Sequence, residues 1–222
     1  MPRNKFPEET IKKILDVSQK LFLEKGYEKT TILDIVNDLG GMTRGAFYHH
    51  FKSKEDVLGA LMEKMFQVAN PFEKVKQETG LNGLEKIKMV MRYSVVEGFV
   101  DEEKAAMDTI AVPLLSNPRF LAEQVKNTQE VAYRFLQPLI EEGMADDSIQ
   151  AGNAKAMAEV VMLFFNIWMI PTIFPCDREE AGSKIMMVKQ MLDALGLPMI
   201  DEALLGEFDR ALTLEYAPVQ GE

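Results

Sequence analysis

The chain of 222 residues is 47% hydrophobic and 27% charged, a composition that suits one large or two small globular domains and excludes wholesale disorder. Its net charge of −10 is uneven, because residues 1–66 hold 11 Lys and Arg against 10 Asp and Glu, whereas the remainder holds 14 against 25. Nucleic acid would repel the acidic remainder, so only the N-terminal segment is expected to present a basic face to phosphate.

The first predicted element is an amphipathic helix. From Ile11 to Phe22 the apolar residues recur at helical spacing, and lysines occupy positions around the rest of the helix. Pro7 suits the start of such a helix, and Gly26 suits the position just after its end. These signals predict a helix over residues 7–25.

Two short helices are expected next. The segment Thr31-Ile-Leu-Asp34 matches a capping box and opens a helix that ends at Gly40-Gly41. Thr43 is expected to cap the second short helix. Three helices, with the last two short and separated by a glycine turn, are the outline of a helix-turn-helix.

The remainder of the chain continues in helical pattern. The segment Ser53-Lys-Glu-Asp56 predicts the start of a longer helix, which ends at Asn70-Pro71. Because no sustained strand pattern is present, the fold class is predicted to be all-α. Glycine and proline breaks, Pro113 among them, separate further helices expected near residues 81–99, 102–112, 118–142, 153–170, 179–194 and 201–216.

The second short helix has the properties of a recognition helix. Gly45 and Ala46 are small where a backbone must approach DNA closely. Arg44 has the planar guanidinium that binds guanine O6 and N7 together, although it is alternatively a phosphate contact alone. Further hydrogen-bond donors expected to anchor phosphates are Thr43, Tyr48, His49, His50 and Lys54.

The neighbouring residues support this interpretation. Phe47 and Phe51 are four residues apart, so we expect them to lie on one face and pack on the earlier helices. The start of the next helix, at Ser53 and Lys54, is also a natural site for an anion.

The segment resembles the signature of the tetracycline-repressor (TetR) family, which is carried here by Thr30-Thr31, by Leu21 to Tyr27 and by Thr43 to Lys54. The resemblance covers about residues 8–62 and adds a DNA contact for Thr31. It implies a helix-turn-helix DNA-binding domain over residues 1–52. It also implies a helical domain over residues 53–222 that binds a small-molecule inducer and the second subunit of a homodimer.

One departure from the family pattern lies in the turn. The chain has one residue more than the common family spacing between Asp34-Ile35 and Phe51, near Leu39-Gly40-Gly41. Because glycine accepts positive φ, we expect the two glycines to absorb the extra residue in a longer turn.

The C-terminal part is rich in Met and aromatic residues, which suit an adaptable apolar pocket for an apolar or amphipathic effector but are equally typical of an ordinary core. The helix over residues 153–170 is apolar nearly all round, which suggests one face toward the core and one toward a partner. The resemblance implies that this helix and residues 179–194 form a four-helix bundle with their counterparts. The candidate ligand contacts are Tyr93, Phe99, Met107, Phe135, Met162, Phe165 and Trp168.

Other classes of protein find little support. His49 and His50 point about 100° apart on a helix and lack a further His or Cys nearby, so no metal site and no cofactor are expected. No motif of a nucleotide-binding or hydrolytic enzyme is present. Cys176 is the single cysteine, which fits a reducing compartment. The longest apolar run, residues 160–170, spans about half of a membrane, so a soluble, cytoplasmic protein is expected.

The sequence thus predicts a ligand-responsive, dimeric regulator of transcription that binds an operator in double-stranded DNA, most simply a repressor released by a small molecule. The alternative is a helical scaffold whose helix-turn-helix binds a protein. Steep salt dependence of DNA binding would distinguish the two.

Overall fold

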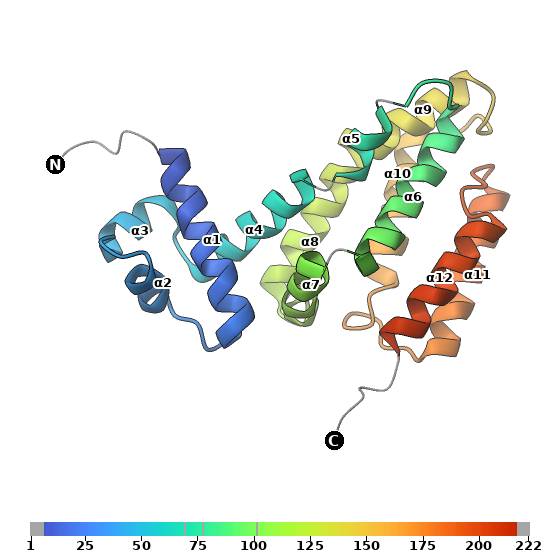
Figure 1. Ribbon diagram of the computed structural model, residues 1–222. Coiled ribbons are helices and arrows are strands. Elements are labelled where there is room, and N and C mark those ends of the chain that lie inside the picture. Colours follow the sequence, from blue (N-terminus) through green and yellow to red (C-terminus); the bar gives the residue numbers. More distant parts are fainter. Residues whose placement is uncertain (1–6, 69, 77, 101, 217–222) are drawn as a thin grey trace. The chain divides into compact units, whose positions relative to one another are not determined.

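The computed structural model of the chain describes the backbone of residues 7–68, 70–76, 78–100 and 102–216. It describes the side chains of these residues apart from 7, 67–68, 96–100, 102–105, 107 and 215. Within these ranges every regular element is a helix, as the all-α prediction requires (Figure 1). The helices are α1 (Pro7–Lys25), α2 (Ile32–Asp38), α3 (Arg44–His50), α4 (Lys54–Val68), α5 (Pro71–Lys76), α6 (Gly83–Val100), α7 (Glu102–Leu114), α8 (Pro118–Val131), η1 (Ala132–Leu136), α9 (Gln137–Ala145), α10 (Ala154–Leu163), η2 (Phe164–Trp168), α11 (Arg178–Ala194) and α12 (Glu202–Glu215).

The chain divides into two compact units. The N-terminal unit extends to Asn70 and includes Ala106–Ile110, and the C-terminal unit comprises Pro71–Ala105 and the chain from Ala111 onwards. The helix α4 therefore groups with the helices before it. The functional boundary expected between residues 52 and 53 stays a prediction.

In the N-terminal unit, α1 packs on α2 and on α4, and α2 packs on α3 (Figure 1). The apolar periodicity explains this packing, because each helix turns one stripe of large side chains inward. Ile14 and Phe22 of α1, Ile35 of α2, Phe47 of α3 and Leu61 of α4 are fully buried. A shared core of this kind holds the two short helices in place, which could not persist as isolated helices of seven residues.

The ends of α1 and α2 follow the capping signals in the sequence. Gly26 follows α1 with φ +86°, the left-handed conformation that favours glycine after a helix. Thr31 caps α2 by accepting a hydrogen bond from Asp34 N, and the Asp34 carboxylate accepts one from Thr31 N at 2.8 Å. This confirms the predicted capping box.

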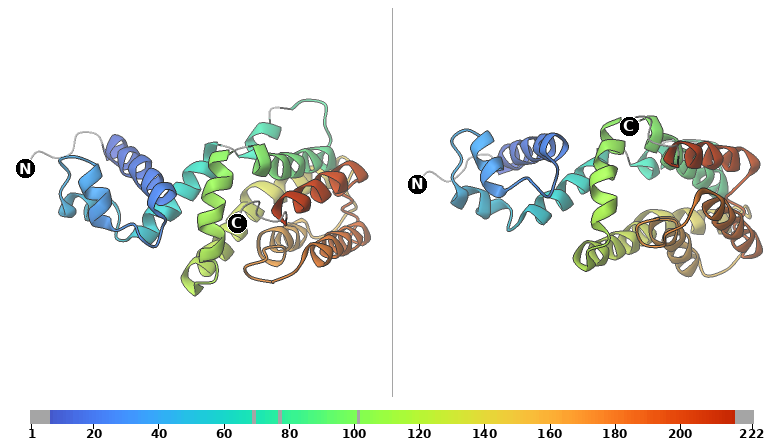
Figure 2. Two further views of the ribbon diagram at one scale, coloured as in Figure 1. Left: turned by 60° about the horizontal axis from the view of Figure 1, so that its bottom comes forward. Right: turned by 90° about the horizontal axis from the view of Figure 1, so that it is seen from below.

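The C-terminal unit is a bundle around α6, which contacts α5, α9 and α12, and around α10, which contacts α8, η1 and α9. In both views of Figure 2, α12 lies alongside α6. The largest fully buried side chains of the C-terminal unit are Ile87, Ile140, Leu192, Leu197, Met199 and Ile200.

The structure departs from the predicted elements at three places. Pro71 was expected only to end the preceding helix, but it begins the short helix α5. Pro113 lies within the last turn of α7 rather than beyond its end. The predicted helices 118–142 and 153–170 each contain a π-helical segment, η1 and η2. Among the described helices, none combines the length and hydropathy needed to cross a bilayer.

Candidate nucleic-acid interface

The turn between α2 and α3 is built on two glycines. Gly40 has φ +52° and Gly41 has φ +104°, and the backbone carbonyl of Asn37 accepts a hydrogen bond from Gly40 N at 3.3 Å. Residues other than glycine rarely adopt these angles. Both glycines thus adopt the positive φ expected of them, and the extra residue relative to the family pattern stays a prediction. At the end of the turn Thr43 caps α3, because Thr43 Oγ1 accepts a hydrogen bond from Ala46 N at 3.1 Å.

The helix α3 has one buried and one exposed face. Phe47 is fully buried and Phe51, just after the helix, is 8% exposed, with their ring centroids 6.2 Å apart. The spacing of four residues places both rings on the same side of the helix. Arg44 and Tyr48, also four residues apart, are exposed beside this face, and Gly45 and His49 are exposed on the side opposite Phe47.

The other residues expected at DNA follow the same arrangement. Gly45, Ala46 and His49 are exposed, whereas His50 is half-buried, with its ring centroid 5.4 Å from that of His49. A Cβ added at Gly45 would meet only Thr43 Oγ1 at 3.9 Å, so the packing of the protein does not require glycine here. A small residue at this position is therefore available for close approach by an external partner.

Thr31 and Thr30 both form hydrogen bonds that stabilise the turn before α2. Thr31 Oγ1 donates to Asp34 Oδ2 at 2.7 Å while accepting from Asp34 N, and the DNA contact expected of Thr31 stays a prediction. The neighbouring Thr30 is buried, and its hydroxyl lies 2.8 Å from Gly26 O and 3.2 Å from Leu21 O. Sequence reasoning gave Thr30 no role. Its hydrogen bonds to carbonyls at the end of α1 anchor the segment that leads into α2.

Asp34 gives the N-terminal unit a dependence on pH. The Lys25 ammonium at 2.7 Å, together with the hydroxyl and N–H of Thr31, holds the pKa of the Asp34 carboxyl well below its usual range. A carboxyl with a lowered folded-state pKa stabilises the fold above its unfolded-state pKa, and this contribution is lost as the pH falls toward the folded-state value.

We therefore expect Asp34→Asn to weaken the acid sensitivity of the N-terminal unit. The free energy of unfolding, measured by urea titration between about pH 2.5 and 7, should fall less steeply below about pH 4 in the variant than in the wild type. Asp38→Asn is the matched control, because Asp38 lies on the same helix and pairs with Lys20 at 3.5 Å but caps nothing. Equal acid sensitivity of D34N and the wild type would contradict the expectation.

Lys54 differs from the exposed residues of α3. Its side chain is half-buried, and its Nζ donates to the backbone carbonyl of Tyr27 at 2.6 Å and lies 4.0 Å from the centroid of the Tyr27 ring. The phosphate contact expected of Lys54 stays a prediction, and the observed contact competes with it.

The start of α4 is capped by the chain itself. Ser53 Oγ accepts a hydrogen bond from Asp56 N at 3.1 Å, and the Asp56 carboxylate accepts one from Lys52 N at 3.1 Å. The first is the contact of the predicted capping signal, whereas the second reaches the residue before Ser53. Because the Asp56 carboxylate already supplies negative charge at this end of the helix, an external anion at Ser53 and Lys54 would have to compete with it.

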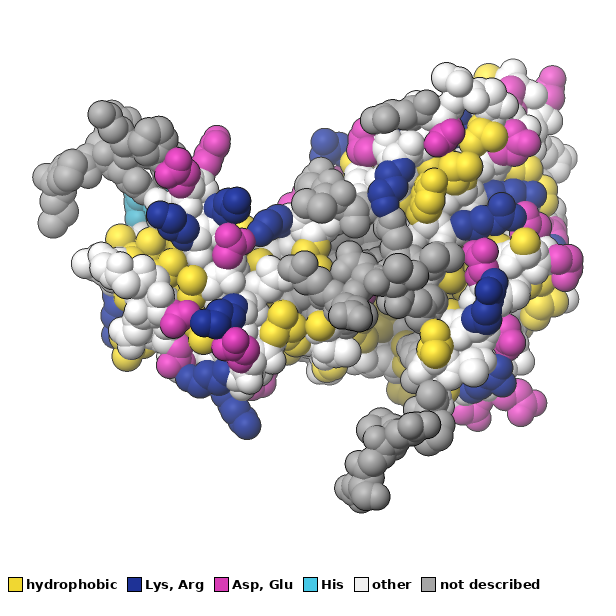
Figure 3. Space-filling view, viewed as in Figure 1, with side chains coloured by type: hydrophobic (Ala, Val, Ile, Leu, Met, Phe, Trp, Pro, Cys, Tyr) yellow, Lys and Arg dark blue, Asp and Glu magenta, His cyan; other side chains and the backbone are white. Residues whose placement is uncertain are grey.

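The charges of the N-terminal unit are mixed. On the face shown in Figure 3, Lys and Arg side chains are interspersed with Asp and Glu side chains over this unit. Three lysines form ion pairs within it: Lys20 with Asp38, Lys25 with Asp34, and Lys64 with Asp16. This face of the unit therefore presents no broad basic surface, and the phosphate contacts expected of α3 stay a prediction.

The candidate effector contacts do not gather in one described pocket. Phe135 is buried and stacks on Phe72 with ring centroids 5.4 Å apart, and Phe165 stacks on Phe208 at 5.9 Å. Tyr93 lies beneath the Lys74 ammonium at 5.4 Å from its ring centroid, and Met162 accepts a hydrogen bond at its backbone carbonyl from Asn166. The side chains of Phe99 and Met107 lie outside the described residues.

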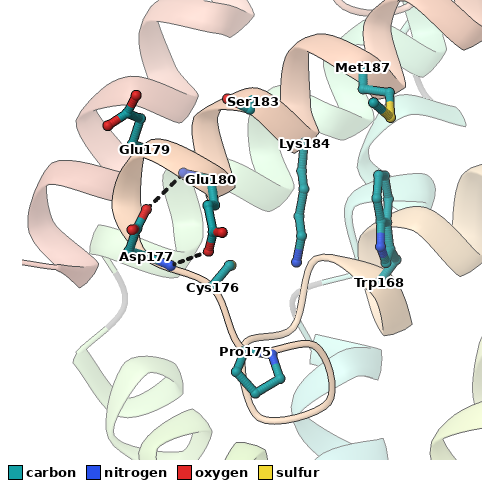
Figure 4. A pocket seen from close by; sticks show the side chains of 9 residues that line it. All are labelled: Trp168, Pro175, Cys176, Asp177, Glu179, Glu180, Ser183, Lys184 and Met187. Carbon is teal, nitrogen blue, oxygen red and sulfur yellow. Dashed lines mark hydrogen bonds between the residues drawn. The ribbon is translucent and has the colours of Figure 1, made fainter.

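Trp168 lines an open pocket of about 380 Å³ at the start of α11 (Figure 4). Lys184 and Met187 extend from α11 toward the indole ring, and the Lys184 Nζ lies 5.7 Å from the ring centroid. Asp177 and Glu180 form the capping box of α11 at the pocket edge. Of the described candidate effector contacts, Trp168 is the one that lines this pocket, so an effector site made by all of them stays a prediction.

The helices α10 and α11 leave large apolar side chains exposed. Met187 is 53% exposed and Met186 is 45% exposed on α11, and Leu163 at the end of α10 is 45% exposed. A contiguous patch of such side chains is typical of a protein interface.

Comparison with known proteins agrees with the geometry of the N-terminal unit. Residues 14–61 match the family described as bacterial regulatory proteins, tetR family. The chain is 35% identical over 60 residues to the HTH-type transcriptional regulator TtgR of Pseudomonas putida. The matched segment covers 27% of this chain and 28% of that protein. It is 28% identical over 149 residues to the HTH-type transcriptional repressor KstR2 of Mycolicibacterium smegmatis, which covers 62% and 66% of the two chains.

The likeness in fold extends further along the chain. A solved structure of a TetR-family transcriptional regulator from Pectobacterium atrosepticum has a TM-score of 0.59 at 19% identity, over 88% of this chain and 98% of that one. The two chains therefore share a fold. The sequence similarity to TtgR covers only 28% of the length of that relative, whereas the family model matches residues 14–61, which lie within α1 to α4.

Proposed function

Residues 14–61 of this chain match the TetR family of bacterial regulatory proteins, and from that premise we propose that the chain is a sequence-specific DNA-binding repressor of transcription. The observation that carries the proposal is the two-sided helix α3. Phe47 fixes α3 in the core of the N-terminal unit, while Arg44 and Tyr48 are exposed beside it. A helix of this kind fits the major groove, with an arginine near its N-terminus directed at base edges.

Each residue of the exposed face has a proposed role. Arg44 contacts a guanine, and Gly45 and Ala46 allow the backbone to approach the duplex. Thr43, Tyr48, His49 and His50 contact phosphates, which set the register of the helix without reading sequence. The operator is double-stranded DNA, which places the protein in the cytoplasm.

A homodimer and an effector complete the proposal. Two recognition helices related by a two-fold axis match a palindromic operator, and the apolar side chains exposed on α10 and α11 support pairing of these helices with a second copy. A small apolar or amphipathic effector bound by the C-terminal unit would release the operator. To do so, it must bind the released state more tightly than the DNA-bound state.

Selection of bound duplexes from random DNA, followed by titration of the selected sequence at several salt concentrations, tests the proposal. We expect an enriched sequence with two related half-sites, and a steep loss of affinity with salt because bound counterions are released from phosphates. A shuffled duplex of the same composition is the control. No enrichment, or binding that is insensitive to salt, would instead favour the alternative of a scaffold that binds protein.

A further inference from the structure

Lys54 lies at a position where its positive charge is unfavourable for the helix that contains it. It is the first residue of α4, and the N-terminal end of a helix carries a partial positive charge that disfavours a lysine. The two residues that follow, Glu55 and Asp56, are acidic, as the same electrostatics favour. A lysine at this position therefore calls for an explanation from outside α4.

The contacts that Lys54 makes outside α4 explain its position. The Tyr27 carbonyl that accepts from Lys54 Nζ lies in the turn that begins at Gly26, two residues beyond the end of α1. The same carbonyl accepts a hydrogen bond from Thr30 N at 3.2 Å, so its acceptor capacity is filled. The Tyr27 ring beneath the ammonium is itself 6% exposed and packs edge-on against Phe22, with centroids 5.1 Å apart. A charged donor is thus held by two groups of a well-packed turn.

This bond encloses the DNA-reading segment. Tyr27 and Lys54 are 27 residues apart, and the chain between them contains α2, the glycine turn and α3. The bond joins the point where the chain enters the helix-turn-helix to the point where it leaves it. Because hydrogen bonds to charged donors are stronger than neutral ones, it restrains both ends of this segment.

We propose that Lys54 is a positioning residue that joins the two ends of the helix-turn-helix and thereby sets the presentation of α3, and that it does not bind phosphate. This inference rests on the proposed function. It also agrees with the start of α4, where the Asp56 carboxylate already accepts from Lys52 N.

The test is Lys54→Met, which keeps the length of the apolar stem and removes the ammonium. We expect operator affinity to fall about tenfold while binding to unrelated duplex changes by less than about twofold, because a misplaced α3 loses base contacts more than phosphate contacts. The slope of log affinity against log salt should change by less than about 0.3, against about 0.9 for one lost phosphate contact. Binding is measured with the full chain at a temperature where urea titration shows each variant folded. Under these conditions, a Lys54 that contributed only to the stability of the fold would leave the affinity unchanged when replaced.

Two further variants sharpen the result. Lys52→Met removes the same charge from an exposed lysine two residues earlier, and it should weaken binding to all duplexes alike. Lys54→Arg should restore most of the operator affinity, because a guanidinium both donates to a carbonyl and stacks on an aromatic ring.

The outcomes separate the two proposals. If the wild type binds no duplex with preference, the proposed function fails, whatever Lys54 does. If the wild type binds its operator but K54M loses affinity equally on all duplexes with a slope reduced by about 0.9, Lys54 is a phosphate contact and the inference is wrong. Operator affinity of K54M equal to that of the wild type would also overturn it.

Discussion

Replacing Gly83 by alanine is expected to destabilise the C-terminal unit by about 3 kcal/mol, the upper range for overpacking a filled interior. Gly83 begins α6 where this helix crosses α9 at Gly143. A Cβ on Gly83 would lie 2.2 Å from Gly143 N, 2.4 Å from Gly143 Cα and 2.7 Å from Leu139 O. All three are backbone atoms, so no side-chain rotation relieves the overlap, and the two helices must separate.

The measurement is urea or thermal unfolding followed by helical circular dichroism. Gly206→Ala is the matched control, because Gly206 lies in α12 of the same unit and a Cβ there meets nothing within 4 Å. Alanine within a helix should stabilise the control variant by about 0.5–1 kcal/mol. If G83A and G206A unfold at the same urea concentration, the close approach of α6 to α9 does not hold in solution.

Arg44→Ala is expected to weaken operator binding by about 1–3 kcal/mol, roughly 5- to 150-fold, and to relax the preference at one base position. The guanidinium is exposed in the first turn of α3, beyond the packing contacts of Phe47, so its removal should leave the stability of the N-terminal unit nearly unchanged. Competition binding with operators that carry each of the four bases at every position measures both effects.

Arg44→Lys distinguishes a base contact from a phosphate contact. Lysine keeps the positive charge but lacks the planar fork that binds guanine O6 and N7 together. If Arg44 contacts a base, R44K should keep binding to unrelated duplex and lose preference at the same base position as R44A. An equal loss for R44A on every duplex, with no change in preference, would show that Arg44 contacts phosphate alone.

Local sequence signals predicted the N-terminal helices well. The helix α1 spans Pro7–Lys25 as expected, because its apolar period, its first-turn proline and Gly26 all act within a few residues. The caps at Thr31 and Thr43 were predicted for the same reason, since each hydrogen bond joins residues three apart.

Structural features that depend on contacts between distant residues were not predicted. The proline at residue 71 reads equally well as the end of one helix or the start of another, and packing of α5 on α6 decides for the start. The π-helical segments η1 and η2 contact α10 and α8 respectively, and no local pattern marks the extra residue in either one.

The candidate interface shows the same division. The pattern from Thr43 to Lys54 was sufficient to predict which residues of α3 face outward, because a helix fixes the direction of each side chain from its spacing. The pattern was insufficient to predict the contact of Lys54, whose partner is the Tyr27 carbonyl 27 residues earlier. It was also insufficient for Thr30, whose hydroxyl lies 3.2 Å from Leu21 O, nine residues earlier.

The sequence by itself determined the helical class, the caps and turns of the helix-turn-helix, and the resemblance of residues 14–61 to the TetR family, because these follow from local residue patterns within one or two helical turns. Only the tertiary structure decided that Lys54 is held by Tyr27, that Gly83 meets Gly143, and that Trp168 lines a pocket apart from Phe135 and Phe165. Each of these depends on which surfaces meet after the chain has folded, and that choice is made by the packing of the whole core rather than by any local pattern.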